Sequence, residues 1–186
     1  TRKESSAASD VYKRQLLCSG EAPVKTLLEG GTGSQSMSQS MPDFLPDRLE
    51  AGTHNVPGIA GLLAGVRYVQ QRGPENILLR ERRLAQLVSE GLRRLPGVTV
   101  YANGDLHSQA GVVSFTSRDL GAEEIAAALG EKDIAVRAGL HCAPLAHETV
   151  GTVDTGTVRV SFSDHNTLRE VEGFLDAMEE ILTQKP

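Results

Sequence analysis

The residues best suited to chemistry in this chain lie in one short stretch, "RAGLHCAPLAH", at residues 137–147. Cys142 directly follows His141, and Arg137 lies a few residues upstream. A cysteine reacts as its thiolate, and positive neighbours raise the thiolate fraction. Gly139 and the proline two residues after the cysteine favour a sharp, stiff turn. The stretch is therefore a candidate nucleophile loop at the end of a strand.

Two other roles are open for Cys142. Free cysteine is among the most buried residue types, so a structural cysteine fits the stretch equally well. A zinc site would use Cys142, His141 and His147. Adjacent ligands are awkward, and the chain has no second ligand pair at a recognised spacing, which argues against a structural zinc pattern.

Arg159 is the second candidate, and it lies in the alternating stretch "GTVRVSFS". Val158, Val160 and Phe162 occupy one face of this predicted strand, so Arg159 points to the other face. Its planar guanidinium group could bind a carboxylate through two hydrogen bonds. An ordinary surface ion pair is the alternative.

Helices and a small sheet are predicted to position these residues. Apolar residues recur at helical spacing between Asn55 and Gly73, and again from Pro74 to Leu95. Strands are predicted at 98–101, 111–117, 134–139 and 156–163, with helices at 121–129 and after Thr167. This order predicts an α+β layer in which a mainly antiparallel sheet lies under helices.

Composition limits the function classes. The chain has 186 residues, 39% hydrophobic and 23% charged, with a net charge of −5. Without a basic stripe, nucleic-acid binding has little support. The apolar runs are too short to span a bilayer, so no membrane partner is expected. Only Cys18 and Cys142 are present, which favours reduced thiols and a cytoplasmic protein.

Residues 1–15 are unlike the rest of the chain. The stretch "SSAASDVYKRQ" is polar and follows neither a helical nor a strand period. It resembles the translation of a transposase adapter used in sequencing libraries, and a disordered natural terminus is the alternative. We expect residues 1–15 to be a non-native or disordered tail, and we exclude them from the fold.

Two further stretches are ambiguous by themselves. The "GGTG" at residues 30–33 is a weak phosphate-binding signal, because it neither follows a clear strand nor opens a helix. Thr53, in "EAGTHN", could be a plain turn residue or a hydroxyl donor to a phosphate. Neither stretch decides a function.

Taken in order, four stretches resemble one family: "EGGTGSQS", "MPDFLPDRLEAGTHNVPGIAGLLAGV", "IAVRAGLHCAPLAH" and "GTVRVSFSDHNT". They are similar to the C-terminal part of a pyridoxal-phosphate-dependent cysteine desulfurase of the class V aminotransferase superfamily. The short cysteine loop is similar to the Suf-type branch. The resemblance implies part of a fold-type I transferase with α/β architecture. Residues 16–95 would end an incomplete large cofactor domain with its loop and linking helices, and 96–186 would form a small α+β domain carrying the cysteine.

The resemblance also implies roles for the thiol site. Cys142 would attack the sulfur of L-cysteine, which leaves a persulfide on the enzyme and releases L-alanine, for iron–sulfur cluster or thio-cofactor synthesis. His141 would support this chemistry. Arg159 would bind the substrate carboxylate, with Arg137 as a second substrate-binding residue. A sulfur-acceptor protein is a possible partner.

Thr53, with Gly52, would reach the phosphate of pyridoxal 5'-phosphate in the neighbouring subunit of a homodimer. His54 departs from the family, which usually has proline there. The Schiff-base lysine is the larger departure. The family places that lysine ahead of a Gly-rich segment, a context that none of the five lysines has: Lys3, Lys13, Lys25, Lys132 and Lys185. We expect the isolated chain to be inactive.

Two other classes of function are possible. The chain could belong to a related class V enzyme, such as a selenocysteine lyase or an aminotransferase-like lyase. It could also be a complete, non-catalytic module that relays persulfide sulfur or binds a partner.

Overall fold

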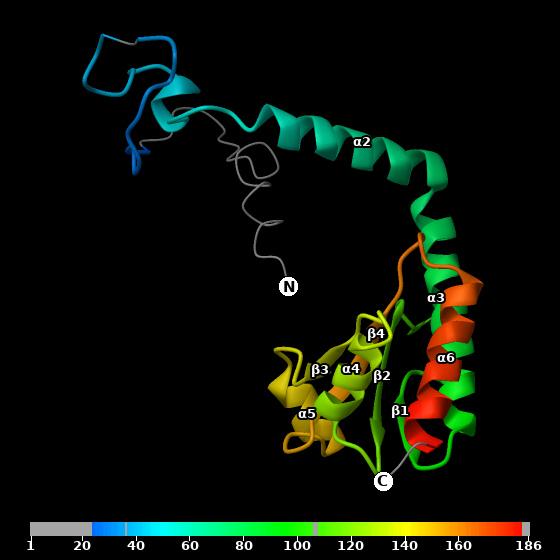
Figure 1. Cartoon of the computed structure of the whole chain (residues 1–186). Coiled ribbons are helices and arrows are strands. Elements are labelled where there is room, and N and C mark those ends of the chain that lie inside the picture. Colours follow the sequence, from blue (N-terminus) through cyan, green and yellow to red (C-terminus); the bar gives the residue numbers. More distant parts are fainter. Residues whose placement is uncertain (1–23, 36, 106–107, 184–186) are drawn as a thin grey trace. The chain divides into compact units, whose positions relative to one another are not determined.

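The computed structural model describes residues 24–35, 37–105 and 108–183 (Figure 1). The chain divides into two units, Thr1–Gln71 and Arg72–Pro186. The expected tail at residues 1–15, the strand expected near "LLCSG" and Cys18 lie outside the described residues. Each unit is described by itself below.

The first unit consists of an irregular segment, a short 3-10 helix η1 (Asp47–Leu49) and the long helix α2 (Val56–Arg72), whose last residue belongs to the second unit. Asn55 begins α2 as predicted, because its side-chain oxygen accepts a hydrogen bond from the backbone N–H of Gly58 at 3.0 Å. No residue of α2 is buried in the described part of the chain. Its exposed apolar side chains are Val56, Leu62, Leu63, Val66, Tyr68 and Val69.

The second unit is a helix-covered antiparallel sheet. Its helices are α3 (Pro74–Arg94), α4 (Ala122–Gly130), α5 (Pro144–Val150) and α6 (Leu168–Thr183). Its strands are β1 (Val98–Tyr101), β2 (Val112–Ser117), β3 (Arg137–Gly139) and β4 (Thr157–Ser161). The strand order is β1-β2-β4-β3, and each neighbouring pair is antiparallel. The predicted antiparallel layer is therefore confirmed.

The core lies between one face of the sheet and helices α3, α4 and α6, and Figure 1 shows α3 and α6 side by side. Phe115 of β2 packs edge-on against Phe174 of α6, with ring centroids 6.3 Å apart. The sheet contributes Val113, Phe115, Val158 and Val160 to this core. Because side chains alternate along a strand, Ser114 and Arg159 point to the opposite, polar face.

Three details differ from the sequence expectations. Helix α5 lies within the segment expected to be a loop, with Pro144 at its start and Gly151 in the left-handed conformation at its end. Strand β3 is shorter than expected, because pairing with β4 begins only at Arg137. The first unit ends at Gln71 rather than near residue 95, because α3 buries one face in the core of the second unit.

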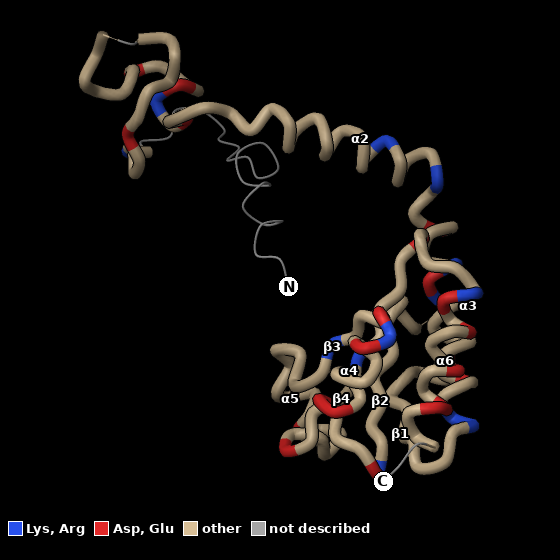
Figure 2. Tube along the Cα trace, in the orientation of Figure 1, with Lys and Arg blue, Asp and Glu red and all other residues tan. Residues whose placement is uncertain are grey.

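Charged residues of both signs are interspersed over the second unit (Figure 2). Acidic residues predominate on α6, whose sequence "LREVEGFLDAMEEILT" has five acidic residues and one arginine. Among the described residues, no helix has the length and apolar character needed to cross a membrane.

Candidate thiol site

The candidate site is built on the ladder between β3 and β4. Arg137 pairs directly with Arg159, and Gly139 pairs with Thr157. Directly paired residues of an antiparallel ladder project to the same face, so the two guanidinium groups share the polar face of the sheet. Like charges directly opposite each other are unfavourable, and a bound anion would relieve that repulsion. The arrangement suits recognition of a carboxylate.

The cysteine lies in a tight left-handed turn immediately after β3. His141 and Cys142 have φ angles of 54° and 60°, a region that non-glycine residues rarely adopt. The backbone N–H of Ala143 donates to the carbonyl oxygen of Leu140 at 2.9 Å and closes the turn. Cys142 is a free, exposed thiol. The structure therefore excludes the alternative of a buried structural cysteine.

Arg137 contacts the thiol. Its Nη2 lies 3.8 Å from Cys142 Sγ, in the geometry of a weak hydrogen bond from the guanidinium group to sulfur. Arg159 is partly buried, and its Nε atom has no hydrogen-bond partner among the residues that the structure describes. The two arginines thus differ, because Arg137 contacts sulfur while Arg159 retains an unused buried donor.

His141 is held by the first residue of β4. Its Nε2 lies 3.1 Å from the carbonyl oxygen of Thr157 and 3.0 Å from the Thr157 hydroxyl oxygen. Burial lowers the pKa of His141 below its ordinary value, and the positive charge of Arg159 lowers it further, outweighing the hydrogen bond to the Thr157 carbonyl. Both effects favour the neutral form of the imidazole.

His147 lies behind this ring in α5. It is buried, its Nδ1 is 2.7 Å from the hydroxyl oxygen of Thr152, and its ring centroid is 5.8 Å from that of His141. Sequence reasoning considered His147 only as a possible zinc ligand. Among the described residues there is no group of three or more His, Cys, Asp or Glu residues that could hold a metal ion.

Gly156 is a site-supporting residue that sequence reasoning missed. A Cβ atom at this position would lie 2.9 Å from the Cα of Gly139, and Gly156 has a φ of 62°. Two glycine backbones therefore touch where the chain leaves β3 and enters β4. A glycine at the end of β3 and another just before β4 were the available sequence signal for this contact. The signal was missed because the two residues are distant in the sequence.

We expect Gly156→Ala to destabilise the second unit by about 2 kcal/mol, because it adds a left-handed alanine and a backbone clash. Urea denaturation of the chain measures the loss. Gly173→Ala is the matched control, since a Cβ there meets nothing within 4 Å and α6 should gain up to about 1 kcal/mol. Equal stability of the Gly156→Ala chain and the unchanged chain would contradict the role of this contact.

In the first unit, the structure brings two ambiguous stretches together. The backbone N–H of Gly52 donates to the carbonyl oxygen of Gly31 at 2.9 Å, which links the "GGTG" stretch to the turn before Thr53. Gly52 has a φ of 95°, a conformation that favours glycine, and Thr53 is exposed. His54 lies 3.7 Å from the carboxylate of Glu50.

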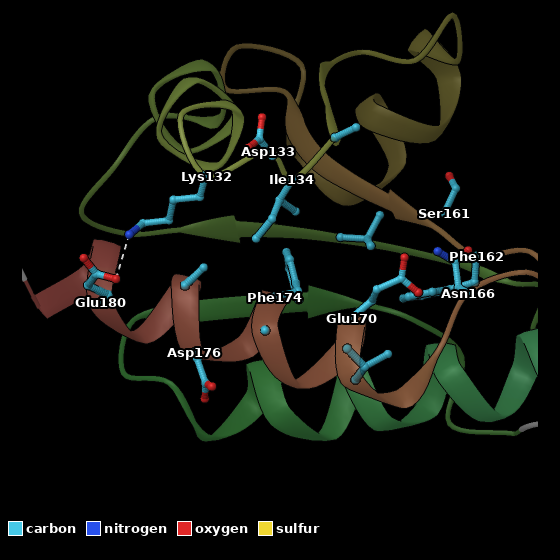
Figure 3. Close-up of a pocket in the computed structure, with 15 residues that line it drawn as sticks. Lys132, Asp133, Ile134, Ser161, Phe162, Asn166, Glu170, Phe174, Asp176 and Glu180 are labelled. Atoms are coloured by element: carbon cyan, nitrogen blue, oxygen red, sulfur yellow. Dashed lines mark hydrogen bonds and ion pairs between the residues drawn. The ribbon is translucent and has the colours of Figure 1, made fainter.

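A cavity of about 650 Å³ lies elsewhere in the second unit, between residues 132–135, the end of β4 and α6 (Figure 3). Ile134 and Phe174 line it from facing sides, and at one end Lys132 forms an ion pair with Glu180 at 2.6 Å. None of the six predicted site residues lines this cavity. Lys132 is thus engaged with α6.

Residues 16–174 match the family model described as aminotransferase class-V. The chain belongs to this family. This class-V chain is 41% identical over 137 residues to a probable cysteine desulfurase of Pyrococcus abyssi, covering 74% of this chain and 33% of that protein. It is 36% identical over 146 residues to a probable cysteine desulfurase of Mycolicibacterium paratuberculosis, covering 78% and 21% respectively.

Solved structures agree with this family assignment. The apo cysteine desulfurase of Thermococcus onnurineus NA1 has a TM-score of 0.69 at 38% identity, covering 86% of this chain and 40% of that one. The Escherichia coli cysteine desulfurase CsdA in an S-sulfonic acid form has a TM-score of 0.67 at 27% identity, covering 86% and 39%. The expected fold-type I architecture is confirmed for the portion present. This class-V chain spans 33% of the length of the Pyrococcus abyssi relative and 21% of the Mycolicibacterium paratuberculosis relative, so it corresponds to about a third or less of either protein.

Proposed function

We propose that this chain is the C-terminal part of a Suf-type cysteine desulfurase. The complete protein removes sulfur from L-cysteine, releases L-alanine and carries the sulfur as a persulfide on Cys142. The observation that carries the proposal is an exposed thiol in contact with one arginine of a cross-strand pair whose other member, Arg159, has an unused buried Nε.

Arg159 receives the substrate carboxylate in this proposal. A guanidinium group can hold both oxygens of a carboxylate in parallel hydrogen bonds, and a carboxylate placed on this face offsets the repulsion between Arg159 and Arg137. Both arginines extend from adjacent strands of a packed sheet. Their backbones are therefore fixed, and they hold the anion more rigidly than two arginines on loops would. The substrate is thereby oriented with its thiol toward the cysteine turn.

Cys142 is the nucleophile. A bond forms between its Sγ and the substrate sulfur while the substrate carbon–sulfur bond breaks. The electron pair of the broken bond remains on the substrate carbon, and protonation of that carbon gives alanine. Arg137 remains in contact with Cys142 Sγ during this step. Pyridoxal 5'-phosphate, when bound, supplies the electron sink for this cleavage.

The first unit offers part of a phosphate contact for that cofactor. The exposed Thr53 follows Gly52, whose left-handed conformation allows a close backbone approach, so these residues suit the phosphate of a neighbouring subunit in a homodimer. The Schiff-base lysine belongs to the part of the protein that precedes this chain. The isolated chain is inactive for this reason, the complete protein is cytoplasmic, and a sulfur-acceptor protein receives the persulfide for iron–sulfur cluster or thio-cofactor synthesis.

The carboxylate role can be tested on the chain itself with two alkylating reagents, in a Cys18→Ser background. Iodoacetate carries a carboxylate and iodoacetamide does not. We expect Arg159→Met to slow the reaction of Cys142 with iodoacetate about tenfold and the reaction with iodoacetamide less than about twofold, because local positive charge recruits anions. Mass spectrometry of the Cys142 peptide measures both rates.

Arg93→Met is the control, because Arg93 is exposed in the last turn of α3, and α3 covers the face of the sheet opposite to Arg159. It should change neither rate. An iodoacetate rate that is insensitive to Arg159→Met would refute the carboxylate site.

A further inference from the structure

One row of directly paired residues crosses all four strands of the sheet. Tyr101 of β1 pairs with Ser114 of β2, Ser114 pairs with Arg159 of β4, and Arg159 pairs with Arg137 of β3. Directly paired residues of an antiparallel ladder project to the same face, so all four side chains share the polar face. The row ends at Arg137, which contacts Cys142 Sγ. Arg159 thus lies between a second arginine and a serine.

The sheet itself leaves Arg159 without a negative partner. The four strands read VTVY, VVSFTS, RAG and TVRVS, so none of them contains an acidic residue. Arg159 is partly buried, and its Nε atom has no hydrogen-bond partner among the described residues. A bound anion is the group that this row lacks.

Ser114 offers a hydroxyl group directly beside this arginine. Paired residues have Cβ atoms about 4.5–5.5 Å apart, and the serine Oγ is bonded to Cβ. The Ser114 side chain is half-buried and forms no hydrogen bond within the part of the chain that the structure describes. A carboxylate accepts hydrogen bonds at about four positions, of which a guanidinium fork fills two. The remaining positions suit a second donor on the strand next to Arg159.

We propose that Ser114 is a substrate-binding residue of the thiol site: its hydroxyl donates a hydrogen bond to the carboxylate that Arg159 holds. This assignment rests on the proposed function, because Arg159 is the carboxylate site there. Contacts from β2 and β4 hold the carboxylate at two points of one sheet, whereas the guanidinium group alone lets the anion tilt. Ser114 thereby fixes the direction in which the rest of the substrate extends from Arg159.

Ser114→Asp tests the placement, because it puts a carboxylate directly opposite Arg159, where it competes with a bound anion. The probes are iodoacetate and iodoacetamide, with the 186-residue chain in a Cys18→Ser background at pH 7. We expect Ser114→Asp to slow the reaction of Cys142 with iodoacetate about tenfold and the reaction with iodoacetamide less than about twofold. Mass spectrometry of the Cys142 peptide measures both rates.

Thr99→Asp is the matched control for added charge. Thr99 lies two residues from Tyr101 on β1 and so points to the same face, but β1 does not pair with β4. We expect this control to slow the iodoacetate reaction less than about twofold. Equal slowing by Ser114→Asp and Thr99→Asp would overturn the assignment, because the effect would then be one of net charge.

The hydroxyl group is tested by removing it. We expect Ser114→Ala to slow the iodoacetate reaction about fivefold, the size expected for the loss of one hydrogen bond, and to leave the iodoacetamide rate within about twofold. Ser114→Thr keeps the hydroxyl on a β-branched side chain that suits a strand, so it should retain most of the iodoacetate rate. Urea denaturation checks that each variant folds. An iodoacetate rate that is the same for Ser114→Ala and the unchanged chain would refute the hydrogen bond.

Arg159→Met separates this inference from the proposed function. If Arg159→Met slows the iodoacetate reaction and the Ser114 variants do not, Ser114 has no part in binding, and the carboxylate role of Arg159 stands. If neither the Arg159 variant nor the Ser114 variants change the rate, the carboxylate site and the Ser114 assignment both fail.

Discussion

Cys142→Ala will abolish persulfide formation and lower alanine production from L-cysteine by at least about 10³-fold, in the protein completed with its upstream cofactor region. The reason is chemical: without Sγ there is no atom to form the new sulfur–sulfur bond. The exposed left-handed turn presents this one thiol beside Arg137. Alanine is measured by chromatography, and the persulfide by the mass of the Cys142 peptide.

Cys18→Ser is the matched control, and it should retain full activity because the proposal gives that residue no role. Undiminished alanine production by Cys142→Ala would refute the assignment of Cys142 as the nucleophile. Alanine formed faster from selenocysteine than from cysteine by the completed protein without substitutions would favour a related lyase of the same family. A completed protein that binds no cofactor would instead favour a sulfur-relay or partner-binding module.

Arg159→Met will lower kcat/KM for L-cysteine about 10²-fold in the same completed protein, because it removes charge-assisted hydrogen bonds worth about 3 kcal/mol. Arg159→Lys should recover only part of the loss, since an ammonium group cannot form the parallel pair of bonds. Most of the effect should appear in KM, because the proposed contact binds the carboxylate before and during reaction.

Arg137→Met provides the contrast, because Arg137 contacts Cys142 Sγ. Its effect should appear mainly in kcat. Steady-state kinetics with L-cysteine separates the two parameters. If Arg159→Met changed kcat alone, the division of roles between the two arginines would be wrong.

Local patterns predicted most of the secondary structure. The helical spacing of apolar residues predicted α2, α3 and α6, and strand alternation placed Arg159 opposite the buried face of β4. Helix α5 was missed because its seven residues are too few to display an apolar period, although Pro144 and Gly151 mark its ends. The short length of β3 was also unpredictable, since the strand extends only as far as it pairs with β4.

The sequence by itself determined the residue types of the site and the face on which each strand residue lies, because these depend on periods of two and 3.6 residues along one element. It also carried the family resemblance. Only the tertiary structure decided that Cys142 is exposed, that Arg137 faces Arg159, and that His141 bonds Thr157. The reason is that strand register and turn closure join residues far apart in the chain, and their energies come from contacts that no local pattern encodes.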